Sequence, residues 1–256
     1  AALDGSGVSI ADVGGKAAGL DHLASCGFPI PSSYVITVEA YQRSVARAGL
    51  SPWLANLAMR PAPEPHDIRA EVDEIEEAFR TVVLEADLRR EIETAAAKLL
   101  AHGRVAVRSS ATAEDLGVAS FAGQYRTFTR IDGIDDVIDA VKRCWASLWL
   151  PAAREYRLRH NVASRGLAMA VVLQSMVEAD WSGVGFTIDP ASDRPAMRVE
   201  MVPGLGEALV SGHVTPVDFS IRRDTLEITS SDPGAQPLRM IEDLARMMLQ
   251  VETRLD

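Results

Sequence analysis

The spacing of apolar residues changes along the chain. In residues 1–103, apolar side chains recur every three or four positions, as they do on one face of a helix. A helix that begins after Asp67, a suitable N-cap, carries Ile68, Val72, Ile75, Phe79 and Val82 on such a face. A second helix carries Leu88, Ile92 and Leu99, and a short helix over Ala17 to Ala24 follows Gly14-Gly15-Lys16. We therefore expect residues 1–103 to form a mainly helical lobe with one short strand, Tyr34 to Thr37.

Beyond Gly103, short apolar runs of the kind that form strands replace the helical spacing. The predicted strands cover 104–108, 125–129, 169–176, 185–187, 198–202 and 217–221. Helices are predicted over 135–160, with a break at Pro151, and near the end of the chain from Leu238 to Leu255. Residues 104–256 therefore form a second lobe, a mixed sheet with flanking helices. The fold class is α+β, and the cleft between two such lobes is a natural ligand site.

Composition narrows the class of protein. The chain has 256 residues, of which 47% are hydrophobic and 24% charged, as in globular domains. Its net charge of −10 disfavours non-specific nucleic-acid binding, which depends on neutralising phosphates. The cysteines Cys26 and Cys144 form no disulfide or metal-binding pattern. The N-terminal sequence has no signal-peptide pattern, and the longest apolar run, Leu167 to Leu173, is too short to cross a bilayer. We expect a cytoplasmic protein without a membrane partner.

The stretch VAVRSSATAEDLGVASFAGQYRTF, residues 105–128, carries the most chemical information. A short strand ends at Arg108, small and hydroxyl-bearing residues follow, and strand character returns at Tyr125. Backbone N–H groups, hydroxyls and arginines are suited to cover a polyphosphate. Composition alone favours an ordinary hairpin loop, with Arg108 paired to Glu114 or Asp115 on the surface.

Three other segments have weaker signals. Lys16 follows two glycines and precedes a helix, which suits a phosphate site, although a solvated lysine beside a glycine turn is the simpler interpretation. The apolar strand that contains Gln174 suits a linker beside adenine or an ordinary core strand. Glu207, in the turn Gly204-Leu205-Gly206, is a candidate metal or ribose ligand or a turn residue.

The order of these segments is more informative than any one of them. GGKAAGLDHL, FPIPSSYVIT, the 105–128 stretch, RCWASLW, AVVLQSMV, SGVGFTIDP and GLGEALVSGHVTP follow one another between Gly14 and Ile221. This succession resembles the ATP-binding domain shared by phosphoenolpyruvate synthase, pyruvate phosphate dikinase and rifampin phosphotransferase. The RSSATAED and SFAGQ segments are its most specific part.

The resemblance implies an ATP-grasp-like fold and an ATP-dependent phosphotransferase. In these families the nucleotide domain passes the β-phosphoryl group of ATP to a histidine on a separate domain, with release of AMP and phosphate. The matching positions imply that Lys16 and Arg108 bind the phosphates and act in catalysis. They also imply that Gly123 and Thr127 contact the phosphates and that Gln174 lies beside the adenine.

The chain departs from the family pattern in three places. It does not contain the Asp-Ile-Glu-Trp and Gln-x-Arg-Pro strands, so the resemblance implies Mg²⁺ but leaves its ligands unassigned. None of the five histidines has the family's Thr-x-His context. Leu150-Pro151-Ala152-Ala153 replaces the usual Glu-Arg-Ala stretch, which puts contacts there in doubt.

Three functions remain open from the sequence. The first is the nucleotide domain of a dikinase-like phosphotransferase, incomplete on its own, which phosphorylates a histidine domain in cis or in trans. The phosphoryl group then passes to a small-molecule acceptor bound elsewhere. The second is a stand-alone, non-catalytic nucleotide-binding or regulatory module. The third is an ATP-grasp ligase that forms an acyl-phosphate, which the RSSATAED and SFAGQ segments disfavour.

Overall fold

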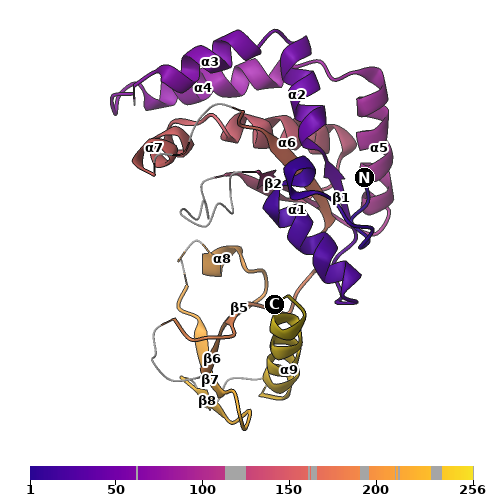
Figure 1. Cartoon of the computed structure of the whole chain (residues 1–256), viewed down its shortest axis with the longest axis vertical. Coiled ribbons are helices and arrows are strands. Elements are labelled where there is room, and N and C mark those ends of the chain that lie inside the picture. Colours follow the sequence, from indigo (N-terminus) through magenta and orange to yellow (C-terminus); the bar gives the residue numbers. More distant parts are fainter. Residues whose placement is uncertain are drawn as a thin grey trace. The chain divides into compact units, whose positions relative to one another are not determined.

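The computed structural model describes residues 1–61, 63–112, 125–160, 162, 166–190, 196–210, 212, 214–231 and 238–255. The chain forms two compact units, Ala1–Met176 and Val177–Asp256 (Figure 1). The sequence placed the change of character at Gly103, but the units divide after Met176. The reason is that β1 (Ser33–Ile36), from the helical part, pairs with β4 (Met169–Ser175) in one sheet.

The first unit contains a four-stranded sheet in the order β1-β4-β2-β3. The central strand β2 (Val105–Ala111) pairs with β4 on one side and with β3 (Thr127–Ile131) on the other. All of these pairs are antiparallel. The helices of this unit are α1 (Ile10–Ser25), α2 (Val38–Arg47), α3 (Ser51–Met59), α4 (Ile68–Arg80), α5 (Ala86–Leu100), α6 (Ile134–Ser147) and α7 (Pro151–Arg159).

Helices cover both faces of this sheet. On one face, the side chain of Ser110 in β2 bonds to the backbone of α1. On the other face, Arg143 of α6 stacks on the ring of Phe128 in β3. Leu173 of β4 also points to this second face, because it lines the same hollow as residues of α5. Side chains alternate between the faces of a strand, so even-numbered residues of β2 face α1 and odd-numbered residues face α5 and α6.

Several predicted elements are confirmed. The helix after Asp67 is α4, the helix with Leu88 and Ile92 is α5, and the long helical region is divided at Pro151 into α6 and α7. The strand over 125–129 is found slightly later, as β3. Helices α2 and α3 and strand β8 (Ile228–Ser230) were not predicted.

The second unit has its own sheet and core. Strands β5 (Trp181–Phe186), β6 (Ala196–Pro203), β7 (Val217–Arg222) and β8 form an antiparallel sheet in chain order. Helix α9 (Leu238–Leu255) contributes Ile241 and Ala245 to a core with Phe219, and α8 (Glu207–Val210) contacts β6.

The α+β class is confirmed, with one correction. The expected single mixed sheet is two separate sheets, and every strand pair among the described residues is antiparallel. Within the part of the chain that the structure describes, no helix has both the length and the apolar character needed to cross a membrane.

Candidate functional site

Arg108 lies near the middle of β2, whereas the sequence predicted that a strand ends there. The strand continues to Ala111 because Ser109 and Ser110 pair with Val171 and Ala170 of β4. Arg108 itself lies opposite Thr127 of β3. Directly opposed residues of antiparallel strands point to the same face, so Arg108 and Thr127 share the face that carries α1.

A chain of hydrogen bonds holds the Arg108 side chain. Its Nη1 donates to Oε1 of Gln174 at 3.1 Å, and Nε2 of Gln174 donates to Oγ of Ser33 at 3.0 Å. The Ser33 hydroxyl donates in turn to the Pro31 carbonyl at 2.7 Å. Gln174 is only 7% exposed, and a buried amide of this kind stabilises the fold only when its polar atoms are paired. This series of hydrogen bonds therefore fixes the Arg108 guanidinium on the face of the sheet that α1 covers.

Lys16 lies in α1, the helix whose backbone bonds to this face of the sheet. The helix is interrupted at Gly14, whose φ is 72° and ψ is 170°. Beside this interruption, the Ser110 hydroxyl donates to the Val13 carbonyl at 2.7 Å and accepts from the Ala17 N–H at 3.1 Å. Lys16 is therefore next to a residue bonded to Ser110, and Ser110 is two positions from Arg108 on the same face.

The structure thus places four of the five predicted site residues on or against one face of the first sheet: Lys16, Arg108, Thr127 and Gln174. Thr127 is exposed, and Lys16 and Arg108 are half-buried. The fifth, Gly123, lies in 113–124, outside the described residues.

Ser109 and Ser110 do not have the phosphate-covering role that the sequence predicted for the hydroxyls after Arg108. Ser109 is 1% and Ser110 is 0% exposed, so neither hydroxyl is open to a ligand. Ser110 bonds to α1, and the Ser109 hydroxyl faces away from it without a hydrogen bond in the described part of the chain. The regular alternation of the extended strand accounts for their burial.

The side chains of Arg126 and Thr127 diverge, as their adjacent positions require. Arg126 forms an ion pair with Glu76 of α4, which leaves Thr127 on the Arg108 side. Glu207 is the first residue of α8, in the second unit. Among the described residues, no group of three or more histidine, cysteine, aspartate or glutamate side chains is arranged to hold a metal ion.

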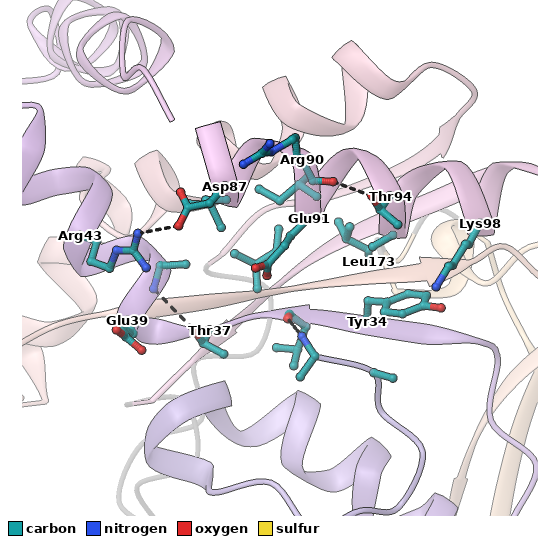
Figure 2. Close-up of a pocket in the computed structure, with 18 residues that line it drawn as sticks. Tyr34, Thr37, Glu39, Arg43, Asp87, Arg90, Glu91, Thr94, Lys98 and Leu173 are labelled. Atoms are coloured by element: carbon teal, nitrogen blue, oxygen red, sulfur yellow. Dashed lines mark hydrogen bonds and ion pairs between the residues drawn. The ribbon is translucent and has the colours of Figure 1, made fainter. Parts of the chain in front are cut away.

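A hollow of about 580 Å³ lies elsewhere in the first unit, between β1 and helices α2 and α5 (Figure 2). Arg43 bonds to Asp87 at its rim at 3.2 Å, and Lys98 lies over the ring of Tyr34. None of the four described site residues lines it. Its floor includes Leu173, which faces the opposite side of the sheet from Gln174, so this hollow is separate from the candidate site.

Sequence reasoning missed Ser33 and Ser110, which hold the site residues in place. Nothing near Ser33 in the sequence indicates that it bonds to Gln174, 141 residues away. For Ser110, the local signal is the Gly14-Gly15 pair, since two adjacent glycines often mark a break that another group must satisfy.

An arginine and a threonine hydroxyl on one face, with a lysine in the helix that packs against it, suit an anion with several oxygen atoms. The fold and this site define an α+β domain with a cationic site on its first sheet. The family model "Pyruvate phosphate dikinase, AMP/ATP-binding domain" matches residues 10–254. The chain therefore belongs to the pyruvate phosphate dikinase AMP/ATP-binding domain family.

Curated relatives agree with this assignment. The chain is 40% identical over 226 residues to a phosphoenolpyruvate synthase of Aeropyrum pernix. The matched region covers 84% of this chain and 27% of that relative. The chain is 40% identical over 245 residues to a probable phosphoenolpyruvate synthase of Methanothermobacter thermautotrophicus, covering 91% and 35%. It is also 40% identical over 216 residues to a rifampicin phosphotransferase of Streptomyces sviceus, covering 83% and 25%. The chain thus spans a quarter to about a third of the length of these relatives.

Proposed function

We propose that this chain is the ATP-binding domain of a dikinase-like phosphotransferase and that it phosphorylates a histidine on a separate domain. The observation that carries the proposal is the placement of Lys16 and Arg108 on or against one sheet face, with Thr127 beside them. Membership of the AMP/ATP-binding family supports ATP as the anion that this face binds.

In the proposed reaction, the triphosphate of ATP is cleaved at two bonds. The bond between the α- and β-phosphates breaks, a histidine nitrogen of the partner domain bonds to the β-phosphorus, and AMP leaves. The γ-phosphoryl group passes to water and is released as phosphate. Phosphoryl transfer of this kind requires positioning and neutralisation of charge more than covalent participation by the protein.

The residues of this chain have distinct parts in the proposed site. Arg108 offers a planar set of donors to phosphate oxygens, and Gln174 holds that guanidinium in place. Lys16 adds a second cation, and the Thr127 hydroxyl adds a donor on the same face. We further propose that Gly123 contacts the phosphates and that the strand around Gln174 lies beside the adenine, as the family pattern implies.

Magnesium ordinarily accompanies ATP in phosphoryl transfer. Mg²⁺ beside ATP is usually held by one or two carboxylates together with phosphate oxygens and water, and the described residues contain no group of three or more metal-binding side chains that would single out its ligands. We therefore assign no step to a metal ion.

The partner proposed here is a histidine-carrying domain, in cis or in trans, which passes the phosphoryl group to a small-molecule acceptor bound elsewhere. Pyruvate and a drug hydroxyl are two acceptors of suitable chemistry. We place this exchange in the cytoplasm.

A second candidate is a non-catalytic nucleotide-binding or regulatory module of the same fold. The two functions share the phosphate site and differ only in whether the bound ATP is consumed.

Product analysis separates these functions. The chain is incubated with ATP alone and then with its cognate histidine domain, and the nucleotides are resolved by chromatography. We expect little AMP from the chain alone, and AMP together with an acid-labile phosphohistidine when the partner is added. ATP that is bound but never consumed would support the regulatory module, and accumulation of ADP would contradict both functions.

A further inference from the structure

The interruption of α1 at Gly14 contains a hydrogen-bonding arrangement that the proposed function does not explain. In an unbroken helix, the Ala17 N–H donates to the Val13 carbonyl, four residues earlier. Here the Ser110 hydroxyl stands between the two groups, donating to the Val13 carbonyl at 2.7 Å and accepting from the Ala17 N–H at 3.1 Å. A side chain from a strand 93 residues away thus replaces one bond of the helix.

The insertion requires the helix backbone to lie directly against β2. A Cβ atom built on Gly14 would lie 2.2 Å from the Ser110 carbonyl oxygen, so only glycine fits there. Ser110 is fully buried, and its hydroxyl is fully engaged by α1. It is therefore unsuited to bind a ligand itself.

The position of this hydroxyl links the two cations of the candidate site. Ala17, which donates to Ser110, follows Lys16 directly. Arg108 lies two residues before Ser110 and on the same face of β2. Movement of α1 along the strand would therefore change the position of Lys16 relative to Arg108.

We propose that Ser110 is a positioning residue of the phosphate site, which sets the place of Lys16 by inserting its hydroxyl into α1. This inference rests on the proposed function, because it gives Lys16 a phosphate to bind. Ser110 acts through Lys16 and touches no substrate.

The chain offers a matched control in Ser109. Its hydroxyl is also buried and lies on the same strand, but it points to the opposite face and has no hydrogen-bond partner in the described part of the chain. Ser109→Ala and Ser110→Ala remove the same group from adjacent positions. Only Ser110→Ala breaks the connection to α1.

The test measures the affinities of the full chain for ATP and for adenosine by calorimetry. The variants are Ser110→Ala, Ser109→Ala, Lys16→Ala and the double variant Lys16→Ala/Ser110→Ala, each shown to be folded by circular dichroism. We expect Ser110→Ala to weaken ATP binding about tenfold, since residues that act through one another have coupling energies of this order. Adenosine affinity should not change, and Ser109→Ala should leave both affinities unchanged. In the Lys16→Ala background, Ser110→Ala should have no further effect.

Two results would overturn the inference. One is an equal loss of ATP and adenosine affinity in Ser110→Ala, which would indicate a general structural role. The other is that the effects of Ser110→Ala and Lys16→Ala multiply in the double variant. If Ser110→Ala does not fold, Ser110→Cys leaves no cavity and keeps only a weak donor and acceptor in a somewhat larger side chain, and the same selective loss is expected. If Lys16→Ala binds ATP normally, the proposed phosphate site and the role of Ser110 are both overturned, whereas the two results above leave the phosphate site in place.

Discussion

At the residue scale, the environment of Arg108 explains how a charged side chain is accommodated inside a sheet. Its strand neighbours Val107 and Ser109 are buried, and Gln174 and Ser33 form a continuous chain of donors and acceptors beside it. Such a chain holds a guanidinium in one orientation without neutralising it, because the amide of Gln174 is uncharged. Within the part of the chain that the structure describes, this contact leaves the positive charge of Arg108 unneutralised, as the proposed phosphate site requires.

Gln174→Glu tests whether that charge matters. The substitution keeps the shape of the side chain but places a carboxylate against Arg108, which would then compete with a phosphate for the guanidinium. We expect about tenfold weaker ATP binding, equivalent to roughly 1.4 kcal/mol. Fluorescence titration with a labelled ATP analogue measures it, and Ser33→Ala, which removes a hydrogen bond of Gln174 but adds no charge, separates the effect of the charge from that of a loosened side chain. Unchanged affinity in Gln174→Glu would indicate that Arg108 does not face the phosphates.

The sequence predicted which residues carry the charges but not how they are held. Lys16 and Arg108 were found from short motifs, and the structure brings both to the α1 face. Ser33 and Ser110 were not found because their partners lie 141 and up to 97 residues away in the chain. Secondary-structure propensity and the spacing of apolar residues depend only on neighbours along the sequence, so they cannot predict hydrogen bonds between residues this far apart.

At the scale of the element, the break in α1 depends on the glycine at position 14. Gly14→Ala should destabilise the protein, because φ of 72° costs an L-residue roughly 1–2 kcal/mol and the new methyl group would overlap the Ser110 backbone. Gly19→Ala, on the exposed side of the same helix with open space around it, should instead stabilise by about 0.4–1 kcal/mol. Urea denaturation monitored by circular dichroism compares the two variants. Equal shifts in the midpoint would show that the break at Gly14 is not required.

Helix α6 contains a thiol whose reactivity reports on packing. Burial raises the pKa of Cys144 from its ordinary value of 9.0 to about 12, and its Sγ lies 3.5 Å from the Arg126 carbonyl. The native thiol therefore stays protonated up to high pH. Its contribution to stability is complete below pH 9 and is lost as the pH rises from 9 toward 12, because only the unfolded form ionises there.

Thiol labelling at pH 8 checks this packing. The half-buried Cys26 should react with a disulfide reagent in the native protein, and Cys144 should react only after denaturation. Cys26→Ser provides the control, since its native form should then show almost no reaction. Rapid labelling of Cys144 in that variant would contradict the close packing of α6 on the sheet.

The boundaries of elements were predicted less well than their existence. The sequence ended a strand at Arg108, but β2 continues through Ser109 and Ser110 because β4 supplies partners for both. Serine is not among the residues that favour strands, so tertiary pairing determines that Ser109 and Ser110 are extended. By contrast, the predicted start of a helix at Gly14-Gly15 agrees with the structure, because α1 is broken at Gly14 and a helical segment follows the break; only the preceding turn from Ile10 was not predicted.

At the scale of the whole molecule, each unit has a separate hydrophobic core. Phe219, 1% exposed, lies in the second core, and Phe219→Ala should cost about 3–5 kcal/mol there. Trp181 belongs to the second unit, and the other tryptophans, Trp53, Trp145 and Trp149, belong to the first.

Tryptophan fluorescence during urea denaturation can follow the units separately. In a Trp181→Phe background, only the first unit contributes to the signal, and we expect Phe219→Ala to leave its midpoint unchanged. With Trp181 present, Phe219→Ala should shift part of the transition to lower urea. A single transition that shifts as a whole in both backgrounds would show that the two cores unfold together.

The proposed function requires Lys16 and Arg108 to bind the triphosphate of ATP at one face of the first sheet. Calorimetric titration of wild type and Arg108→Ala with ATP and with adenosine tests it most directly. Charge-assisted hydrogen bonds contribute roughly 1.5–3 kcal/mol each, so Arg108→Ala should bind ATP about ten- to a hundredfold more weakly. Its affinity for adenosine should be unchanged. Arg104→Ala, which removes an exposed arginine just before the same strand, should bind both ligands as wild type does. Equal ATP affinities for wild type and a folded Arg108→Ala would contradict the account.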